Sequence, residues 1–534
     1  MAVANPPFGS VAAPAARSST RGLAYKWLVL IVVLPGMTLF TIDITVVNVA
    51  LAKLGAVFAI SVDTVQWAIT AYALATGVVT PLAAFVEHRF TMKRVWVICL
   101  AGFTAASVLC GLAPVFWVLV VGRIMQGVAA GLLLPMLISL IFQVFPANER
   151  GAALGFFAIP IVAGPALGPT LGGYIITNWD WRLVFFINLP IGIAATVLGM
   201  LLLRPGVPRH GMRFDAWGFV LSALAFGGTL YGLSQVSSHG WSSFEVRAFI
   251  GVGLVSLAAF IGYELTRKDP LLDVRLFAIP QFLNSNIVGW VATVALFGAE
   301  FMLPLYLQNL RGLSAVETGL MLLPQGLAIA LAGPIAGRLV DRVGARWIVM
   351  FGFVLMAINT WQLSQLTLTT DFGTLRWLLA IRGLALGCTM QPTTLTALAA
   401  APVDVRTNAS SLVTAMRSVW QSFGIALLAT LVQTQTVVHS AVLGWQVRPD
   451  TTQGQFLVTI GAGLQQATQA SEPAANAMAL AIVLGQVAQQ AAVLAFADAY
   501  RVSFVASIVA FLLSLLLPGR SATRIDPAEM MGGG

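Results

Sequence analysis

Long apolar segments separated by short polar ones run along almost the whole chain. A helix needs about 20 mostly apolar residues to cross the roughly 30 Å core of a bilayer, and fourteen segments meet this length or come close to it. They lie at about 27–51, 64–86, 95–112, 115–141, 151–177, 182–203, 214–236, 246–264, 283–307, 317–339, 346–368, 374–400, 407–433 and 503–518. The pattern predicts an all-α polytopic membrane protein with fourteen spans.

The composition supports this interpretation, because 58% of the residues are hydrophobic and only 9% are charged. Soluble domains carry roughly 25% charged residues, so this chain could not cover a water-exposed globule. Of its 29 Lys and Arg residues, 19 fall in the termini and the loops of one side, 7 in the opposite loops and 3 inside spans. Because positive charge accumulates on the cytoplasmic side, both termini are expected in the cytoplasm. The net charge of +9 is then a topology signal, and no nucleic-acid partner is expected.

Three landmarks recur in the same order in the first and last parts of the chain. The matched pairs are Pro81 with Pro334, Arg123 with Arg382, and Arg150 with Arg406, at offsets of 253, 259 and 256 residues. These pairs predict two duplicated halves, with chance similarity of glycine-rich helices as the alternative. Two matched halves around a site at the membrane midplane form a common transporter plan.

This organisation divides the chain into five parts. They are a disordered cytoplasmic N-terminus (1–26), a six-helix half (27–203), a linker with two extra spans (204–282), a second six-helix half (283–518) and a cytoplasmic tail (519–534). The second half includes an external loop at about 434–500, which is rich in Ala, Gln and Gly and in which we expect one or two short helices.

The fifth predicted span holds the segment AGPALGPTLGGY at 163–174. Small residues let membrane helices approach closely, and a proline removes a backbone hydrogen bond and kinks its helix. The residues concerned are Gly164, Gly168, Gly172, Gly173, Pro165 and Pro169. We expect a kinked helix with a smooth face that slides on a helix of the other half, and a static helix pair is the alternative.

Two carboxylates lie deep within predicted spans, where a charge costs at least about 2.5–3.5 kcal/mol. Asp43 stands in the middle of the first span and Glu300 near the end of the ninth. Burial and a neighbouring cation shift the proton affinity of a carboxylate in opposite directions, so either residue can serve as a proton site or bind a cationic substrate. A static hydrogen bond between helices is the alternative for Asp43, and a structural acid for Glu300.

Several polar, aromatic and methionine side chains could form an adaptable wall around a hydrophobic substrate. The residues proposed for this role are Asn48, Trp67, Tyr72, Gln126, Tyr306, Gln308 and Arg417, together with Asp43 and Glu300. Each aromatic residue taken singly is more often packed or lipid-facing, and Arg417 could equally bind the loops.

Two segments carry a family resemblance. GPALGPTLGG at 164–173 resembles the antiporter motif of the major facilitator superfamily, and WRLVFFINLPIG at 181–192 resembles a marker of its fourteen-helix drug/proton antiporters. Matches at DITVVNVAL (43–51), LPLYLQ (303–308) and ASSLVTAMR (409–417) extend the resemblance over nearly the whole chain. The chain is therefore similar to the EmrB-like multidrug efflux pumps.

The resemblance implies further roles. Arg123 corresponds to an arginine that the family associates with proton coupling, and Gln126 belongs to the same motif. The second copy of the superfamily's loop motif GxLxDRxGRK is well matched and includes Gly337, Asp341 and Arg342. The resemblance implies that the motif aspartate, here Asp341, pairs with arginine and helps to hold the inward-closed state together. The first copy of the motif retains only Arg89, Lys93 and Arg94 and lacks the aspartate. The corresponding contact is therefore in doubt in the first half, although Glu87 could take the place of the aspartate.

These observations predict a proton-coupled multidrug efflux antiporter of the cell inner membrane. It would export hydrophobic or cationic compounds by alternating access, with the proton gradient as energy source and no cofactor. The resemblance suggests a periplasmic membrane-fusion adaptor and an outer-membrane channel as partners, docked through the loop at about 434–500. Alternatives are an exporter or symporter of one metabolite or siderophore, and a channel.

An enzyme is the rival from another class. The sequence offers no nucleophile–base pair and no P-loop. The four histidines are scattered along the chain and the three cysteines lack metal-ligand spacing, so no metal site is expected.

Overall fold

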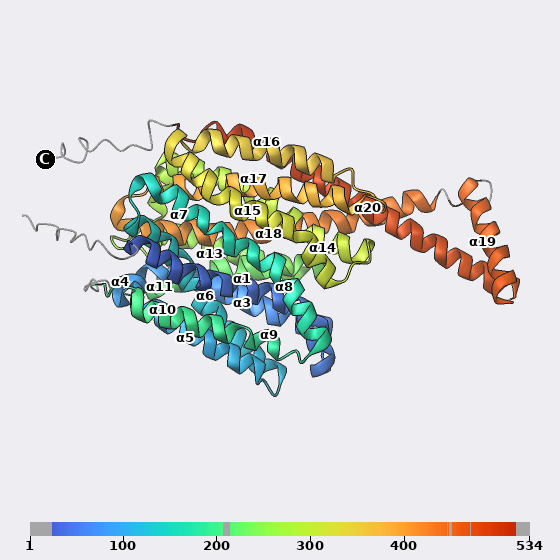
Figure 1. Ribbon diagram of the computed structural model, residues 1–534, viewed down its shortest axis with the longest axis horizontal. Coiled ribbons are helices and arrows are strands. Elements are labelled where there is room, and N and C mark those ends of the chain that lie inside the picture. Colours follow the sequence, from blue (N-terminus) through green and yellow to red (C-terminus); the bar gives the residue numbers. More distant parts are fainter. Residues whose placement is uncertain (1–23, 207–213, 446, 448–450, 470, 520–534) are drawn as a thin grey trace, which may run out of the picture.

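The computed structural model describes residues 24–206, 214–445, 447, 451–469 and 471–519, and no strand occurs within these ranges. Figure 1 shows long helices lying side by side in one bundle, with a helical arm projecting from one end. The fold class is thus all-α, as predicted. The segments predicted as a disordered N-terminus and a cytoplasmic tail lie almost wholly outside the described residues.

The helices of the first half cover its six predicted spans. They are α1 (Tyr25–Phe58), α3 with α4 (Trp67–Val79 and Ala83–Phe90), α5 (Met92–Gly111), α6 (Phe116–Val144), α7 with α8 (Arg150–Phe156 and Ala158–Asn178), and α9 with α10 (Leu183–Phe186 and Asn188–Leu202). A short 3₁₀ turn joins α3 to α4 at Thr80–Leu82. The fifth span is interrupted at Phe157, whereas the helix runs on through its glycine- and proline-rich part.

Two inserted helices and the second half follow. The insert consists of α11 (Ala216–Ser234) and α13 (Phe244–Thr266). The second half begins with α14 (Pro280–Leu305), which continues into the π-helical turn η4 (Tyr306–Leu310). The helices that follow are α15 (Ala315–Val343), α16 (Ala345–Leu363), α17 (Phe372–Ala400), α18 (Arg406–Gly444), α19 (Thr452–Thr468) and α20 (Glu472–Ser514). Eleven helices of the described chain are long and apolar enough to cross a membrane.

Local signals explain where some of these helices begin. Ser314 caps α15 by accepting a hydrogen bond from the Glu317 backbone N–H, and the Glu317 carboxylate accepts one from the Ser314 N–H in return. Asp371 caps α17 by accepting from the Thr374 N–H at 3.0 Å. Such caps satisfy N–H groups that the first helical turn leaves unpaired.

The segment at 434–500 differs from the predicted external loop with short helices. The helix α18 runs on to Gly444, and α20 begins at Glu472, about 30 residues before the predicted last span. At 1.5 Å per residue these helices are each about 60 Å long, twice the bilayer core. Their ends and α19 form the projecting arm of Figure 1. Ala and Gln lower the hydropathy of this segment but favour a helix, which is why hydropathy alone predicted a loop.

Within each half the helices pack in a similar way. In the first half α1 packs on α8, and α6 packs on α3 and α5; in the second, α15 packs on α17, and α14 on α18. The two halves meet where α15 contacts α7 and α8, and where α18 contacts α6. The inserted pair α11 and α13 lies beside this junction, since α11 contacts both α3 and α18.

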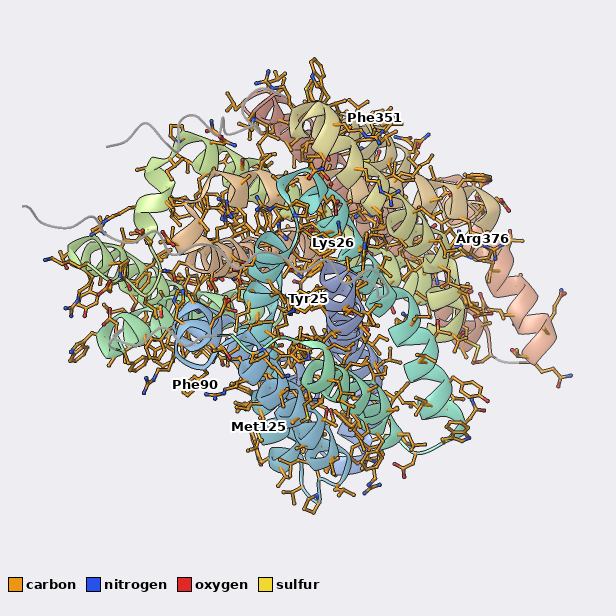
Figure 2. The ribbon with its side chains drawn as sticks, turned by 60° about the vertical axis from the view of Figure 1, so that its left-hand side comes forward. Tyr25, Lys26, Phe90, Met125, Phe351 and Arg376 are labelled. Carbon is orange, nitrogen blue, oxygen red and sulfur yellow. The ribbon has the colours of Figure 1, made fainter. Side chains whose placement is uncertain are left out.

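The outer surface of the bundle is apolar. Figure 2 looks toward the end where α1 begins, with Tyr25 and Lys26 near the centre, Phe351 at the top, and Phe90 and Met125 at the lower left. Phe90, Met125 and Phe351 are exposed large hydrophobic side chains, like many others on these helices. A continuous apolar surface of this kind fits a lipid environment, so the protein is built to span a membrane several times.

Candidate functional site

Asp43 lies at the centre of a polar cluster inside the first half. Its carboxylate is completely buried and forms an ion pair with Arg123 of α6. It also accepts hydrogen bonds from Gln126 Nε2 at 3.1 Å and from Asn188 Nδ2, at the start of α10, at 2.6 Å. Three donors from two other helices therefore hold this charge within the apolar interior.

Arg123 is held as firmly as its partner. Its Nε donates to the Ala68 carbonyl of α3 at 2.7 Å, and its Nη1 also donates to Gln126 Oε1 at 2.8 Å. The guanidinium lies over the Tyr72 ring, 4.5 Å from the centroid, where the face of the ring attracts a cation. One nitrogen, Nη2, is buried without a hydrogen-bond partner. The cluster thus joins α1, α3, α6 and α10 around one ion pair.

The Asp43–Arg123 pair carries no net charge as a whole. Breaking a buried ion pair by neutralising one member leaves an uncompensated charge and costs about 3–5 kcal/mol. A proton on Asp43 would leave Arg123 in that condition, with Nη2 already unpartnered. Loss of the charge on Asp43 would therefore favour any arrangement that rehydrates or re-pairs Arg123.

A second cluster lies in the second half around Glu300 of α14. Gln325 Nε2 donates to both Glu300 oxygens, at 2.8 and 2.9 Å, and Arg382 Nε donates to Oε2 at 3.3 Å. Arg382 also donates to the Leu296 carbonyl at 3.0 Å and keeps Nη1 buried without a partner. The Glu300 side chain is 23% exposed, whereas that of Asp43 is 0% exposed. The second carboxylate is therefore the more accessible one.

Helix packing gives the register of the repeat. A Cβ atom on Gly127 of α6 would lie 2.4 Å from the Tyr72 carbonyl oxygen, and one on Gly383 of α17 would lie 2.3 Å from that of Gln325. These matching contacts align Gly127 with Gly383, which makes Arg382 the counterpart of Gln126. The predicted equivalence of Arg382 and Arg123 is therefore wrong by one helical turn, because two arginines were matched without the glycines that set the packing.

The predicted substrate-wall residues are not gathered in one place. Trp67 stacks on Tyr231 of the inserted helix α11, with ring centroids 5.9 Å apart. Asn48 is exposed and lies five residues beyond Asp43 on α1, hence on a different face. Tyr306 is buried and donates to the Thr367 carbonyl at 2.7 Å, while Gln308 is exposed on the π-helical turn. Tyr72 alone of these aromatic residues reaches the Asp43 cluster.

The glycines spaced four apart on α8, namely Gly164, Gly168 and Gly172, form a stripe that faces α1 of the same half. A Cβ atom on Gly164 would lie 2.6 Å from the Thr41 carbonyl oxygen, and one on Gly168 would lie 2.0 Å from Thr45 Oγ1. Thr45 also donates to the Gly164 carbonyl at 2.8 Å. The expected sliding partner in the other half is therefore wrong for this stripe, because a threonine-bearing face of α1 fills it.

Other members of the segment lie differently. A Cβ atom on Gly172 would lie 3.1 Å from Val46 of α1, and one on Gly173 would lie 3.3 Å from Ala315 and Val316 of α15 in the second half. Pro169 is half-buried, and the side chain of Pro165 lies outside the described residues. Of the four glycines at 164, 168, 172 and 173, only Gly173 thus faces a residue of the other half.

Four other glycines bring the backbones of the two halves close together. A Cβ atom on Gly337 of α15 would lie 1.9 Å from the Gly151 carbonyl oxygen of α7, and one on Gly155 would lie 2.3 Å from that of Gly333. Glycines spaced four apart on both helices let the two backbones touch. Asp341, one turn beyond Gly337, accepts hydrogen bonds from the N–H groups of Gly151 and Ala152 at 3.0 and 3.2 Å.

The remaining loop-motif residues flank this contact. Arg342 lines a cavity of about 370 Å³ with Trp27, Glu149 and Asp341, and Lys26 forms an ion pair with Glu149 nearby. Arg89 is exposed in the last turn of α4. Glu87 accepts a hydrogen bond from Gln143 Nε2 of its own half at 3.1 Å. In the contact of α7 with α15, the second copy of the motif contributes hydrogen bonds through Asp341.

Sequence reasoning missed three polar residues of these clusters. Asn188 and Gln325 bind Asp43 and Glu300 directly, and Ser107 of α5 accepts from Gln126 Nε2 at 2.8 Å. All three lie in apolar surroundings, which was the available signal, because an isolated amide or hydroxyl within a span needs a partner. No group of three or more potential metal ligands occurs within the part of the chain that the structure describes.

The fold and the clusters define a class, namely a two-half helical membrane transporter with an intramembrane ion pair in each half, fully buried in the first half and partly exposed in the second. The sequence profile of the Major Facilitator Superfamily matches residues 33–425. The chain belongs to this superfamily, and it is a multi-pass protein of the cell inner membrane.

Named relatives and solved structures agree with this assignment. The chain is 32% identical over 410 residues to the uncharacterized MFS-type transporter YhcA of Bacillus subtilis, covering 77% of each chain. It is 31% identical to the lincomycin resistance protein LmrB of Listeria monocytogenes, over 79% of this chain and 89% of LmrB. It is 30% identical to the multidrug export protein EmrB of Escherichia coli, over 80% of this chain and 84% of EmrB.

The solved structures share the fold at low sequence identity. A double-Trp mutant of XylE superposes with a TM-score of 0.59 at 14% identity, over 93% of this chain and 96% of XylE. An inward-facing bacterial homolog of the human lysosomal transporter Spinster gives 0.53 at 17% identity, over 95% of this chain and 100% of that homolog. The family and these relatives are transporters.

Proposed function

We propose that this protein is a proton-coupled antiporter that exports hydrophobic drug-like compounds across the inner membrane. The single observation that carries the proposal is the buried Asp43–Arg123 ion pair, which joins α1 to α6. The names of relatives at about 30% identity, LmrB and EmrB, support export of drugs as the task. The proton gradient supplies the energy, and no cofactor takes part.

In this mechanism a proton and the substrate favour different conformations, since only ligands with such a difference can be coupled. A proton entering from outside neutralises Asp43 and frees Arg123, which shifts α1 relative to α6. Release of the proton to the cytoplasm restores the ion pair. Glu300, which is partly exposed beside Arg382, is the second carboxylate that can take part.

Conformational change also requires the halves to separate and close. The glycine contact of α7 with α15, together with Asp341, holds the halves together at the end where α1 begins. Both termini are proposed to be cytoplasmic, so this contact would close the cytoplasmic side. Its rupture would open the path from the cytoplasm.

The arm formed by α18, α19 and α20 is proposed to dock a periplasmic adaptor protein that leads to an outer-membrane channel. It extends well beyond the bundle and exposes apolar side chains such as Val437, Val442 and Val458. Deleting α19 would then abolish drug resistance in cells while leaving drug transport in proteoliposomes unchanged. Equal loss in both assays would argue that the arm serves folding instead of docking.

Purified protein in proteoliposomes with an imposed pH gradient tests the proposed function. An antiporter moves a fluorescent hydrophobic drug only while the gradient lasts, and the drug in turn stimulates proton movement. Drug movement that ignores the gradient would indicate a uniporter or channel. Gradient-driven movement of one metabolite alone would indicate a specific exporter or symporter.

A further inference from the structure

Arg417 of α18 lacks the carboxylate partner that the other two intramembrane arginines have. It is half-buried, and its Nη2 donates to Thr394 Oγ1 of α17 at 2.5 Å. No acidic side chain of the described residues lies within ion-pair distance of it, whereas Arg123 pairs with Asp43 and Arg382 with Glu300. A guanidinium inside a membrane protein normally has a counter-charge, so Arg417 is available for one.

Three other unpartnered donors lie on the same helices, α14 and α18. Ser285 Oγ and Trp290 Nε1, both on α14, are buried without a hydrogen-bond partner. Trp420 Nε1, three residues beyond Arg417 on α18, is in the same condition. An indole N–H can only donate, and buried polar groups are nearly always satisfied. Three unsatisfied groups beside a lone cation indicate that an acceptor-rich, negatively charged group binds here.

Two of these three residues, Ser285 and Trp290, border a space that Arg417 also lines. Ser285, Asn286, Trp290, Thr393, Thr394 and Arg417 line one cavity between α14, α17 and α18. The cavity measures about 10 Å³, which suffices for about one water molecule. A larger ligand can enter only after α14 and α18 move apart, as a helix movement during transport would allow.

The Trp290 ring lines this space and packs on a second aromatic ring outside the lining, that of Trp420. The indoles of Trp290 and Trp420 are stacked, with centroids 5.7 Å apart and planes inclined by 18°. Stacking of a further aromatic ring on such a pair is favourable beyond simple burial. The surroundings of Arg417 therefore combine a charged group with an aromatic platform.

The position of Arg417 on α18 points toward the junction of the halves. Ser410, on the same helix, donates to the Pro135 carbonyl of α6 in the first half at 2.7 Å. Arg417 follows Ser410 by seven residues, which is two helical turns and the same face. The site thus lies two turns along the face that α18 turns to the first half, where a transported compound would pass.

We infer that Arg417, Ser285, Trp290 and Trp420 form a recognition site for an aromatic organic anion, with the guanidinium and the N–H groups holding its carboxylate and the indoles holding its ring. This inference rests on the proposed function, because it names a substrate class for the proposed exporter. The inference adds aromatic anions to the proposed substrates, because the acidic clusters around Asp43 and Glu300 would not by themselves select an anion.

Equilibrium dialysis of the full-length protein in lipid nanodiscs tests the inference with three labelled probes. They are 1-naphthoate, the uncharged 1-naphthamide and the cation 1-naphthylmethylammonium, which share one ring system. We expect saturable binding of 1-naphthoate, roughly tenfold or more tighter than that of either analogue. Absence of saturable 1-naphthoate binding, or equal binding of all three probes, would overturn the inference.

Variants then assign the binding to the site. Arg417→Gln is expected to weaken 1-naphthoate binding by roughly ten- to a hundredfold and to leave 1-naphthamide binding unchanged. Arg376→Gln removes the same charge from an exposed position on α17 and should change neither. Unaltered 1-naphthoate binding in Arg417→Gln would contradict the assignment.

Two further measurements distinguish a failed anion site from a folding defect and from failure of the proposed function. If Arg417→Gln does not elute as a single species, two further variants test the site. Ser285→Ala removes an unpartnered donor with little change in volume, and Trp290→Phe removes the indole N–H while keeping an aromatic ring. Each should weaken 1-naphthoate binding several-fold, and unchanged binding in both would contradict the inference. Drug-stimulated proton flux in wild-type proteoliposomes does not depend on this test. Its presence without naphthoate binding would reject the anion site and retain the proposed antiporter.

Discussion

The Asp341 carboxylate of α15 accepts a hydrogen bond from the Gly151 backbone N–H of α7 at 3.0 Å, across the boundary between the two halves. The N–H groups at a helix start carry partial positive charge and attract an anion. The contact is therefore electrostatic as well as steric, and it needs no arginine side chain. A single aspartate thus adds a polar contact to the glycine packing of α7 on α15.

Asp341→Asn should loosen this contact, because the amide is neutral and offers one acceptor oxygen where the carboxylate offers two. A loss of about 1–2 kcal/mol would shift the equilibrium between joined and separated halves by roughly tenfold. Disulfide trapping of cysteines placed on α7 and α15 measures the joined fraction. Asp371→Asn is the matched control, since Asp371 caps α17 within one half; equal effects of both variants would refute the role given to Asp341.

Gly337→Ala should block the approach of α7 to α15. The new Cβ atom would lie 1.9 Å from the Gly151 carbonyl oxygen, which only a separation of the backbones relieves. We expect transport to fall by roughly tenfold or more, because overpacking of this kind costs about 1–3 kcal/mol or more in the joined state alone. Gly262→Ala on α13, where nothing lies within 4 Å, should leave transport intact. Normal transport by Gly337→Ala would show that the halves need not touch there.

Gly168→Ala should destabilise the first half itself. The Cβ atom would meet Thr45 Oγ1 at 2.0 Å, so α8 could no longer rest on α1. We expect a loss of about 1–3 kcal/mol, seen as a lower unfolding temperature in detergent. Thr45→Ala added to this variant should recover part of the loss, as expected for contacting residues. Strict additivity of the two changes would contradict the observed packing.

Glu300→Gln should destabilise the second half more than the double variant Glu300→Gln/Arg382→Gln. The single change leaves the buried Arg382 guanidinium uncompensated, at a cost of about 3–5 kcal/mol, whereas removing both charges is often nearly neutral. Thermal unfolding of the three proteins in detergent measures the order. A double variant less stable than Glu300→Gln would mean that Arg382 has another counter-charge.

The sequence alone was enough to predict most helices and two residues of the candidate site. Hydropathy located the helices, because only apolar helices of this length satisfy their backbone within lipid. It also identified Asp43 and Glu300, since an acid within an apolar span is conspicuous. Pairing them with Asn188 and Gln325 required the fold, because these partners come from helices more than 20 residues away along the chain.

The limits of the sequence were clearest for glycines. Gly164 and Gly168 were expected to face the other half, yet they face α1, while Gly151 and Gly155 make the contact between halves. Spacing by four shows that a helix has a smooth face but not which neighbour covers it. The long helices of the arm were missed for a related reason, since hydropathy reports burial in lipid and not helix formation.

The measurement that tests the central claim most directly is drug-stimulated proton flux in proteoliposomes carrying Asp43→Asn. Because this change leaves Arg123 uncompensated, the double variant Asp43→Asn/Arg123→Gln is measured beside it, so that a folded protein without the ion pair is available. The account predicts that both variants still bind the drug but that the drug no longer moves protons. Proton flux at the wild-type level in either folded variant would contradict the coupling role of Asp43.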